Sequence, residues 1–543
     1  MKKFAVLISG VLFLMNSAFA GGILTNTNQS AQFVRMLSRN ASTDLDAVYF
    51  NPAGLTQLKN GFYFGLHNQT ITQTKTISSE FPKLKFDEYI GDVKAPVFPT
   101  AFAVYKIDSW AFSAGFGPNG GGGSADYANG LPSFEKQIAR LVPTLSSLSL
   151  MGITPPADYG VDISFEGTSV FWGIQVGATY KINDMVSVYG GARYLPSTNT
   201  YKGSITNIQL GPQGAPINGK TFLTNAAAVA NGKALATAAG AASLQPLITG
   251  GAGSLTTTQA RAMNIINDTQ KAQIEGGLKQ LGLTDAEIAA TTIAAAQSKY
   301  STTSATLAGA ASQLTANSAG LGDKFVETKQ TGTGITPIIG VNIHLDKLNI
   351  GLKYEHQTKL ELTNATVVDD TNPQLFPDKG KSRSDIPGII AGGADYKVLD
   401  NLKVSGSFNI YLDENVNWGK NIYMQDRTID KNYVELAFGL EYNLTKNFAV
   451  SAGYLNSNMG VSEEYQSDFS YSNDSYTTGL GFQWNISKKL VLDAGAMLTT
   501  YKDYTKSFDS SFDASAAAIG KSYNETYGKD TFTFAFGIGY KIF

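Results

Sequence analysis

Few residues in this 543-residue sequence have the types and spacing that catalysis or metal binding requires. The histidines His67, His344 and His356 are too scattered to form a metal-ligand motif. The sequence has no cysteine, which excludes disulfides, thiolate-bound metals and thiol catalysis. It shows neither the glycine pattern of a nucleophile elbow nor that of a phosphate-binding loop. We therefore expect no catalytic residue, no metal and no cofactor.

Arg193 and Lys353 are the cations that could hold a carboxylate, because each lies out of phase with its apolar neighbours in a period-two run. The apolar neighbours are Val186, Val188, Ala192 and Tyr194 around Arg193, and Ile350, Leu352 and Tyr354 around Lys353. A strand would place both cations on its small and polar face. Glu355, Lys359 and Glu361 share the phase of Lys353. An ion-pair network is therefore the alternative to a ligand site.

The elements that position these cations are strands with a persistent period of two. In the last one, the apolar face carries Phe532, Phe534, Phe536, Ile538, Tyr540 and Ile542. The opposite face carries Thr531, Thr533, Ala535, Gly537, Gly539 and Lys541. Faces so rich in glycine and charge do not suit a dry core, so we expect the apolar faces to lie outermost, against lipid. A soluble β-sandwich with its apolar faces inside is the alternative.

Seven similar junctions separate or end these runs. Each begins with the end of a strand, and a short polar turn or the end of the sequence follows. They begin at Tyr105, Tyr180, Ile343, Tyr396, Tyr442, Trp484 and Tyr540. Strands that go out and back from one edge are typical of an antiparallel transmembrane β-barrel, and in a bilayer such a sheet must close. The junctions predict an all-β fold of fourteen strands. We expect them near 61–77, 97–107, 109–118, 165–182, 184–202, 326–345, 347–365, 385–398, 401–414, 431–444, 447–460, 474–487, 489–503 and 530–543.

The N-terminus has the features of an export signal. A basic start is followed by a short apolar stretch and the Ala18-Phe19-Ala20 exit, which predicts a signal peptide at 1–20, cleaved near Ala20. The apolar stretch is shorter than the roughly 20 residues that a spanning helix needs. An exported barrel belongs in the outer membrane of a Gram-negative bacterium. The net charge of −2, without a basic tract, argues against nucleic acid as a partner.

Two long connections interrupt the strands at the edge opposite the short turns, where we expect partly helical extracellular loops. The larger, 203–324, contains Thr284-Asp285-Ala286-Glu287, a capping box that predicts a helix through Ala296. In the other, 119–164, an apolar stripe predicts a helix that Pro143 would kink or split. We expect this stripe either to pack on another loop or to form an apolar capture groove. Its residues are Phe134, Ile138, Leu141, Leu145 and Leu148.

Residues 21–60 precede the first strand and lack its alternation, so they are the candidate plug of a lumen that side chains alone do not fill. They end in Asn51-Pro52-Ala53-Gly54 after an acidic and aromatic lead, where Pro52 and Gly54 favour a rigid bend. This motif resembles the hatch of the FadL family of outer-membrane transporters for long-chain fatty acids and other hydrophobic compounds. The likeness extends over nearly all of the mature chain, with 203–324 as a departure.

The resemblance implies a route. An apolar groove in the outer loops captures the ligand, which moves to a lumen pocket beside an N-terminal hatch at 21–60, and then through a lateral exit at a kink in the third strand. Gly115, Gly117 and Pro118 match the end of that strand, although they could simply end it. Arg193 and Lys353 would lie near the inner pocket. Ile23 and Leu24 would form an apolar tip that competes for it.

We therefore expect a non-enzymatic channel for passive uptake of hydrophobic molecules, most of all long-chain fatty acids. Its partners would be the ligand, outer-membrane lipid, lipopolysaccharide and, during biogenesis, the barrel-assembly machinery, and we expect a monomer. Aromatic hydrocarbons are the alternative cargo. An open porin, a surface adhesin that uses the 203–324 loop, and an outer-membrane phospholipase or protease are the other functions that this architecture allows.

Overall fold

The computed structural model describes residues 23–371, 374–418, 426–511 and 513–543. The predicted signal peptide, 1–20, lies outside the described residues. The described chain forms two compact units. One consists of Gln137–Asp162 and Thr206–Asp323, and the other contains the remaining described residues.

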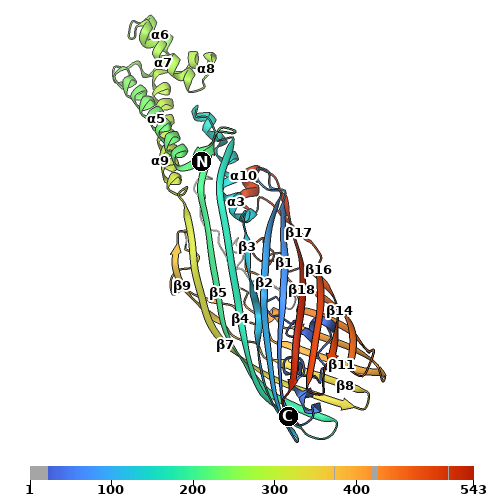
Figure 1. Ribbon diagram of the computed structural model, residues 1–543. Helices are drawn as coiled ribbons and strands as arrows, with labels where there is room; N and C mark the ends of the chain where they lie inside the picture. Colours follow the sequence, from blue (N-terminus) through green and yellow to red (C-terminus); the bar gives the residue numbers. More distant parts are fainter. Residues whose placement is uncertain (1–22, 372–373, 419–425, 512) are drawn as a thin grey trace. The chain divides into compact units, whose positions relative to one another are not determined.

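One antiparallel sheet dominates the second unit, and it closes because β1 pairs with β18 (Figure 1). Residues pair without interruption from Tyr63–Lys541 to Ser79–Glu525 along that junction. The strands of the sheet are β1 (Gly61–Ser79), β2 (Glu88–Ile107), β3 (Trp110–Tyr127), β4 (Asp158–Lys181), β5 (Val186–Gly211), β6 (Ile217–Asn218), β7 (Lys324–Leu345), β8 (Leu348–Glu355), β9 (Glu361–Asp369), β10 (Lys381–Arg383), β11 (Ile389–Leu399), β12 (Leu402–Tyr411), β13 (Tyr433–Asn443), β14 (Phe448–Asn458), β15 (Ser475–Asn485), β16 (Leu490–Tyr501), β17 (Tyr504–Phe508) and β18 (Tyr523–Lys541).

The predicted fourteen-stranded barrel is confirmed in the described residues. Eleven spans are single strands, and three more consist of the pairs β8/β9, β10/β11 and β16/β17, while the two-residue β6 lies in an outer connection. Several predicted boundaries were wrong, because apolar alternation stops before the hydrogen-bonded ladder does. β2 begins at Glu88 instead of 97, and β3 continues to Tyr127 instead of ending at 118.

The apolar faces point outward, as the alternation predicts. On β18, Phe532, Phe534 and Phe536 are 49%, 50% and 42% exposed, whereas Thr531, Thr533 and Ala535 are at most 2% exposed. A water-soluble sandwich would bury such rings, and burial of each would contribute roughly 1.5–3 kcal/mol. An apolar outer face on a closed barrel is the arrangement that a bilayer stabilises.

The six internal short turns confirm the predicted edge, and exposed aromatic rings gather close to it. These rings belong to Tyr105, Trp110, Tyr180, Tyr396, Tyr442, Trp484 and Tyr540. Tyrosine and tryptophan prefer the membrane–water interface, because their rings are apolar and their tips are polar. Within the described ranges, no helix is both long and apolar enough to cross a membrane.

The helical part of the first unit lies between β5 and β7. Its long helices α5 (Gly219–Thr249) and α9 (Ile293–Ala319) run side by side (Figure 1). The shorter ones are η3 (Ala252–Ser254), α6 (Thr257–Ala262), α7 (Asp268–Gln280) and α8 (Asp285–Ala290). The predicted capping box at Thr284 starts α8, but the helix ends at Ala290 instead of 296. Thr291 has an extended backbone, and the Thr292 hydroxyl accepts from the Ala295 N–H, so a second cap starts α9.

The apolar stripe of the 119–164 connection is divided among three short helices. They are α3 (Pro132–Ala139), α4 (Leu141–Thr144) and η2 (Leu145–Met151). The break falls at Arg140, before Pro143, which lies in the first turn of α4 where proline is tolerated. Two further short helices, η4 (Asp413–Asn415) and α10 (Ala514–Ile519), lie in other outer connections.

The N-terminal segment, residues 23–58, lies inside the barrel and is almost entirely buried. It contains α1 (Ala31–Met36), α2 (Ala47–Phe50) and the 3-10 helix η1 (Pro52–Gln57). α1 contacts β13 through β16, whereas η1 contacts β2, β3 and β7. The segment therefore fills the space between opposite walls. We call it the hatch segment.

Candidate functional site

Ion pairs fix α1 to one wall of the barrel. The Arg35 guanidinium donates to Asp493 on β16 at 2.9 Å and to Glu441 on β13 at 2.6 Å. A third bond, 2.9 Å long, reaches the Ser451 hydroxyl on β14. The Arg35 side chain and Asp493 are fully buried, so this pair is shielded from water and from screening salt.

A second ion cluster holds the turn after α1. Arg39 donates to both oxygens of Asp46, at 2.8 and 2.7 Å, and to Asp44 at 2.7 Å. The Ser42 hydroxyl donates to Asp46 at 2.7 Å. Burial by itself would raise the pKa of Asp46, but Arg39 outweighs it and holds that pKa below its ordinary value. The segment from α1 to α2 therefore behaves as one internally braced unit.

The Asn51–Gly54 motif is clamped to the wall through its backbone. The Pro52 and Ala53 carbonyls accept hydrogen bonds of 2.7 Å from Thr179 on β4 and Ser187 on β5. The Asn51 amide donates to Asn342 on β7 at 2.7 Å. Gly54 is not among the residues with positive φ, but a Cβ there would lie 2.5 Å from Asn51 Nδ2. Glycine is therefore needed for space rather than for an unusual dihedral angle.

The ladder between β2 and β3 is interrupted next to the hatch segment. Pairing stops after Lys94–Ser124 and resumes at Ala101–Phe116, and among the described residues none of 95–100 pairs with β3. Pro96, Pro99 and Pro118 have no N–H to offer in this stretch. Gly121 and Gly122 have φ values of 63° and 110°. Of the predicted kink residues, Gly117 and Pro118 lie in this gap, whereas Gly115 pairs with Phe102, and β3 continues past all three.

The hatch segment supplies the donors that this stretch of β3 lacks. Asn26 donates its side-chain amide to the carbonyls of Pro118, at 3.1 Å, and Gly121, at 2.8 Å. Its backbone N–H reaches the Asn119 carbonyl at 2.8 Å. Gln29 donates to the Pro118 carbonyl at 2.9 Å. A Cβ on Gly120 would lie 2.2 Å from the Leu24 carbonyl, so the two backbones approach closely.

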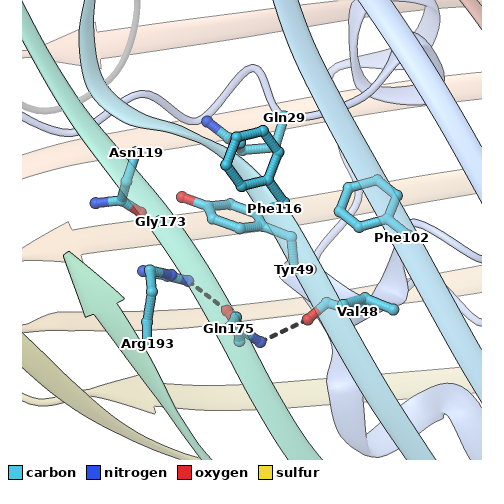
Figure 2. A pocket seen from close by; sticks show the side chains of 11 residues that line it. Gln29, Val48, Tyr49, Phe102, Phe116, Asn119, Gly173, Gln175 and Arg193 are labelled. Carbon is cyan, nitrogen blue, oxygen red and sulfur yellow. Dashed lines mark hydrogen bonds between the residues drawn. The ribbon is translucent and has the colours of Figure 1, made fainter. Parts of the chain in front are cut away.

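A small cavity lies between the hatch segment, β3 and β4 (Figure 2). Figure 2 shows Gln175 between Arg193 and the backbone of Val48, with hydrogen bonds of 2.7 Å on both sides. The space between atoms measures about 250 Å³, but only about 10 Å³ admits the centre of a water molecule. That is room for about one water, so a longer ligand requires movement. The lining residues are Gln29, Val48, Tyr49, Phe102, Gly115, Phe116, Gly117, Asn119, Gly173, Gln175 and Arg193.

Arg193 and Lys353 come together with Glu355 in a buried ion-pair network. Arg193 binds both oxygens of Glu355, at 2.5 and 3.0 Å, and the Lys353 ammonium donates to the same carboxylate at 2.7 Å. Lys353 also donates to the Tyr49 carbonyl at 2.7 Å. Both cations lie within 5 Å of the Tyr49 ring. The predicted lumen cations thus have partners in this state and tie α2 to the wall.

Lys359 and Glu361 do not join this network, contrary to their predicted phase. Both side chains are exposed, and Glu361 pairs with Lys381 at 2.8 Å. The irregular stretch between β8 and β9 shifts the alternation by one residue. Odd-numbered residues therefore face the lumen before this stretch and the outside after it.

The other predicted residues lie in two places. Ile23 and Leu24 are buried in a cluster with Val416, Trp418 and Tyr465. Phe134 packs edge-to-face on Phe469, with ring centroids 4.9 Å apart. The remaining stripe residues, Ile138, Leu141, Leu145 and Leu148, are at most 6% exposed.

Several residues at the site were missed from the sequence. Arg35 and Arg39 are the two cations in the sequence of residues 23–58, which lacks the alternation of a strand. Asn26 and Gln29 belong to a polar run, Asn26-Thr27-Asn28-Gln29, which precedes an apolar helix. A buried plug must hydrogen-bond to the lumen wall, and that run was the available signal.

No family model matches the sequence, and no curated protein does. Among solved structures, a Pseudomonas aeruginosa FadL homologue is similar with a TM-score of 0.56 and 12% identity, over 96% of this chain and 100% of that one. The toluene transporter TodX of Pseudomonas putida gives a TM-score of 0.49 and 11% identity, over 95% and 99%. The toluene transporter TbuX of Ralstonia pickettii gives 0.43 and 12%, over 91% and 93%.

The first of these similarities exceeds a TM-score of 0.5, and at 12% identity it concerns the fold. It agrees with the barrel closed by β1 and β18 and filled by residues 23–58. The chain therefore has the fold of the FadL-type barrels, as the resemblance around Asn51–Gly54 implied.

Proposed function

We propose that this protein is an outer-membrane channel for passive uptake of hydrophobic small molecules, with long-chain fatty acids as the foremost cargo. The ligand enters through the outer loops, where the stripe that begins at Phe134 would have to separate from its packing partners to form a capture groove. It reaches the lumen beside the hatch segment. Movement of that segment then lets it leave sideways between β2 and β3 into the membrane.

The observation that carries this proposal is the interrupted ladder between β2 and β3 beside a nearly filled cavity. A barrel wall is normally sealed by continuous hydrogen bonding, because unpaired backbone groups are costly in lipid. Here the unpaired carbonyls are satisfied from inside, by Asn26 and Gln29. Movement of these two side chains would open the wall without breaking strand pairing.

The FadL-type fold and the resemblance of the hatch motif support this class of cargo. Toluene transporters are among the similar structures, so aromatic hydrocarbons are the alternative cargo. The apolar outer face supports a location in lipid, and the signal-like sequence at the N-terminus supports export to the outer membrane. We expect a monomer that is surrounded by lipid and lipopolysaccharide and is inserted by the barrel-assembly machinery.

The test is uptake in a transport-deficient Gram-negative strain that expresses the full chain. We expect labelled oleate or toluene to enter faster than in the same strain with an empty vector. Planar-bilayer recordings should show little steady ion current, because the hatch segment fills the lumen. Equal uptake in both strains would refute transport, and a large steady current would favour an open porin.

A surface adhesin is a second candidate, because the helical insertion forms a cluster of its own. Leu244, Ile266, Leu278 and Ile293 are buried together within it. Deletion of residues 219–319 separates the two functions. If the insertion has no adhesive role, both uptake and attachment should persist, whereas adhesion predicts that attachment is lost while uptake is intact.

A further inference from the structure

The outer face of the barrel carries a hollow between β5, β7 and β9. It forms where β7 changes its neighbour, because β8 pairs with β7 up to Glu355 and β9 pairs with it from Thr363 onward. Between these points, none of residues 332–337 pairs with β8 or β9 in the described chain. The connecting residues, 356–360, step towards the lumen and leave the outer side of β7 uncovered.

Two glycines of β7 allow this inward step. A Cβ on Gly334 would collide with Thr358 Cγ2, and a Cβ on Gly332 would collide with the Glu361 carbonyl. Thr358 is held in place because its backbone exchanges two hydrogen bonds of 3.0 Å with Ile386. The side chains behind the step pack in one buried apolar cluster, which consists of Phe171, Leu195, Leu360, Leu362 and Ile386. The hollow is therefore closed towards the lumen and is reached from outside the barrel.

The lining of the hollow carries many hydroxyl groups. Its volume is about 590 Å³, and Thr198, Thr331, Thr333 and Thr363 line it together with Trp172. Threonine hydroxyls can donate to and accept from oxygen-rich groups. A wall of this kind suits a polar headgroup better than a hydrocarbon, whose sites are mostly apolar.

Lys359 supplies a positive charge that no carboxylate neutralises. Its side chain is exposed and lines the hollow, and no ion pair joins it to a carboxylate of the described residues. Glu361 also lines the hollow, but it pairs with Lys381 at 2.8 Å. An ammonium group beside several hydroxyls suits a phosphate, because phosphate oxygens accept hydrogen bonds from both.

The hollow lies at the outer boundary of the apolar band. On β7, the outward side chains from Leu345 to Ile335 are apolar, and threonine and charge follow from Thr333. Leu345 and Ile335 are ten positions apart, which corresponds to about 25 Å of height for a strand tilted by about 40°. Phe116 and Trp172 stack with ring centroids 5.1 Å apart, as aromatic rings at a membrane interface do. Lipid headgroups, not acyl chains, lie at this level.

We propose that the hollow binds the phosphorylated sugar headgroup of one lipopolysaccharide molecule, its lipid A part. Lys359 contacts a phosphate, Thr331 and Thr333 donate to its oxygens, and the Trp172 indole covers a sugar ring. The inference rests on the outer-membrane location in the proposed function and does not depend on transport. It gives lipopolysaccharide one defined place on the barrel wall.

The test is native mass spectrometry of the purified full chain with added lipid A. Fully dephosphorylated lipid A is the comparison, because it keeps the sugars and the acyl chains. We expect one bound copy per barrel and a preference for the phosphorylated form of about five-fold or more, as one basic residue near a charged lipid provides. Equal binding of both forms would overturn the proposal. Equal binding of phosphatidylglycerol would also overturn it, because the site would then accept any anionic lipid.

Variants separate this site from general charge attraction. K359M should weaken binding of lipid A about five-fold, whereas K359R should retain it. T331V/T333V changes no charge and should also weaken binding. K94M is the matched control, because Lys94 is an exposed lysine of β2 outside the hollow, and its affinity should equal that of the wild type. Equal losses in K94M and K359M would refute the site, and should K359M fail to fold, K359R and T331V/T333V decide.

Uptake assays distinguish failure of this inference from failure of the proposed function. Uptake of oleate or toluene by cells reports transport, whereas lipid A binding by the purified chain reports the hollow. If the channel transports oleate but binds both forms of lipid A equally, the site is refuted and the function stands. If it binds lipid A selectively but transports neither compound, transport is refuted and the site stands.

Discussion

The hatch segment meets two walls of the same barrel, and it is held to them by different interactions. Against β13, β14 and β16, Arg35 is fixed by buried carboxylates at 2.6 and 2.9 Å, and those strands pair without interruption. Against β3, the amides of Asn26 and Gln29 contact backbone carbonyls beside an interrupted ladder. From this difference we expect the end of the hatch segment at β13, β14 and β16 to stay fixed and the end at β3 to move.

A gap in the wall does not stabilise a closed barrel, because it leaves backbone groups without strand partners. The β2–β3 interruption is therefore a local exception to the continuous strand pairing that stabilises the barrel. Neutral hydrogen bonds exchange for water at a small net cost, whereas separation of a buried ion pair costs several kcal/mol. We therefore expect residues 23–29 to move and α1 to remain anchored.

The largest effect is expected from a cross-link across the gap. A Cβ on Gly117 would lie 3.4 Å from the Thr100 Cβ, close to the distance that a disulfide spans. Oxidation of T100C/G117C should abolish uptake, and reduction should restore it. The chain has no other cysteine, so the bond is unambiguous.

The matched control for this cross-link is I71C/T533C, at the continuous junction of β1 and β18. Both native side chains are buried on the inner face, at 1% exposure. Oxidation there should leave uptake unchanged. Equal inhibition by both disulfides would mean that the gap is not the exit.

The next effect concerns the fixed wall. R35M removes the cation between Asp493 and Glu441 and should destabilise hatch packing by about 3–5 kcal/mol, because it leaves the fully buried Asp493 without a cation, whereas Glu441 keeps Lys403 at 3.1 Å. We expect a raised steady conductance and faster trypsin cleavage near Arg39.

The control for R35M is R261M in the helical insertion, whose partner Asp268 is largely exposed. Such an exposed pair contributes little to stability, because water and salt screen it, so conductance should not change. A normal, silent channel in R35M would contradict the idea that ion pairs anchor α1.

A smaller effect is expected at the mobile end. N26A/Q29A removes three side-chain hydrogen bonds to β3 and should destabilise the closed state by about 2–3 kcal/mol. Brief conductance events should become more frequent, and uptake should accelerate. N28A is the matched control, because Asn28 donates to Gln69 on β1 at 3.0 Å instead of to a carbonyl of β3. If N28A had the same effect, the hydrogen bonds to β3 would not be its specific cause.

Acidification should have the smallest effect on stability. Protonation of Asp46 would destabilise the folded protein, whereas protonation of Asp468 would stabilise it. The pKa of Asp46 lies below its ordinary value, so its stabilisation is present at pH 5–8 and is lost only as the pH falls through that lowered value. Burial raises the pKa of Asp468, in the β14–β15 connection, to about 6. Its ionised form is disfavoured when folded, so stability increases as the pH falls from about 6 towards 4.

The melting temperature should therefore rise by roughly a few degrees between pH 7 and pH 5. D468N should remove part of this dependence, because the amide cannot ionise, and Asp413, whose pKa burial raises to about 7, should contribute to the remainder. In contrast, protease sensitivity of the hatch segment should stay constant over that range. A hatch that loosens at pH 5 would show that Asp46 is not the anchor.

The fold could be predicted from the sequence because lipid imposes a regular pattern. Phe532, Phe534 and Phe536 alternate with small residues, and this pattern does not depend on the loops. The short polar turns identify one edge of the barrel. The ends of the strands were harder to predict, because the hydrogen-bonded pairing of β2 and β3 extends past the last residue of the apolar alternation. The phase error at Lys359 arose because a few irregular residues reverse the alternation, and no residue type marks such a stretch.

The candidate site was predictable only in part. Proline and glycine at positions 115–118 indicated where the wall could deviate, because they remove a donor or a side chain. The partners of Arg193 depended on distant residues, since Glu355 lies 162 positions away.

The helical insertion leaves and returns on adjacent strands, where Ile205 pairs with Lys324. Its two ends are therefore neighbours in the sheet, and the shear and closure of the cylinder do not depend on what lies between them. One recombination event could add or remove the whole insertion without a change in strand register. This junction is thus a natural site for a lineage to acquire a new surface module, and for an engineer to display one.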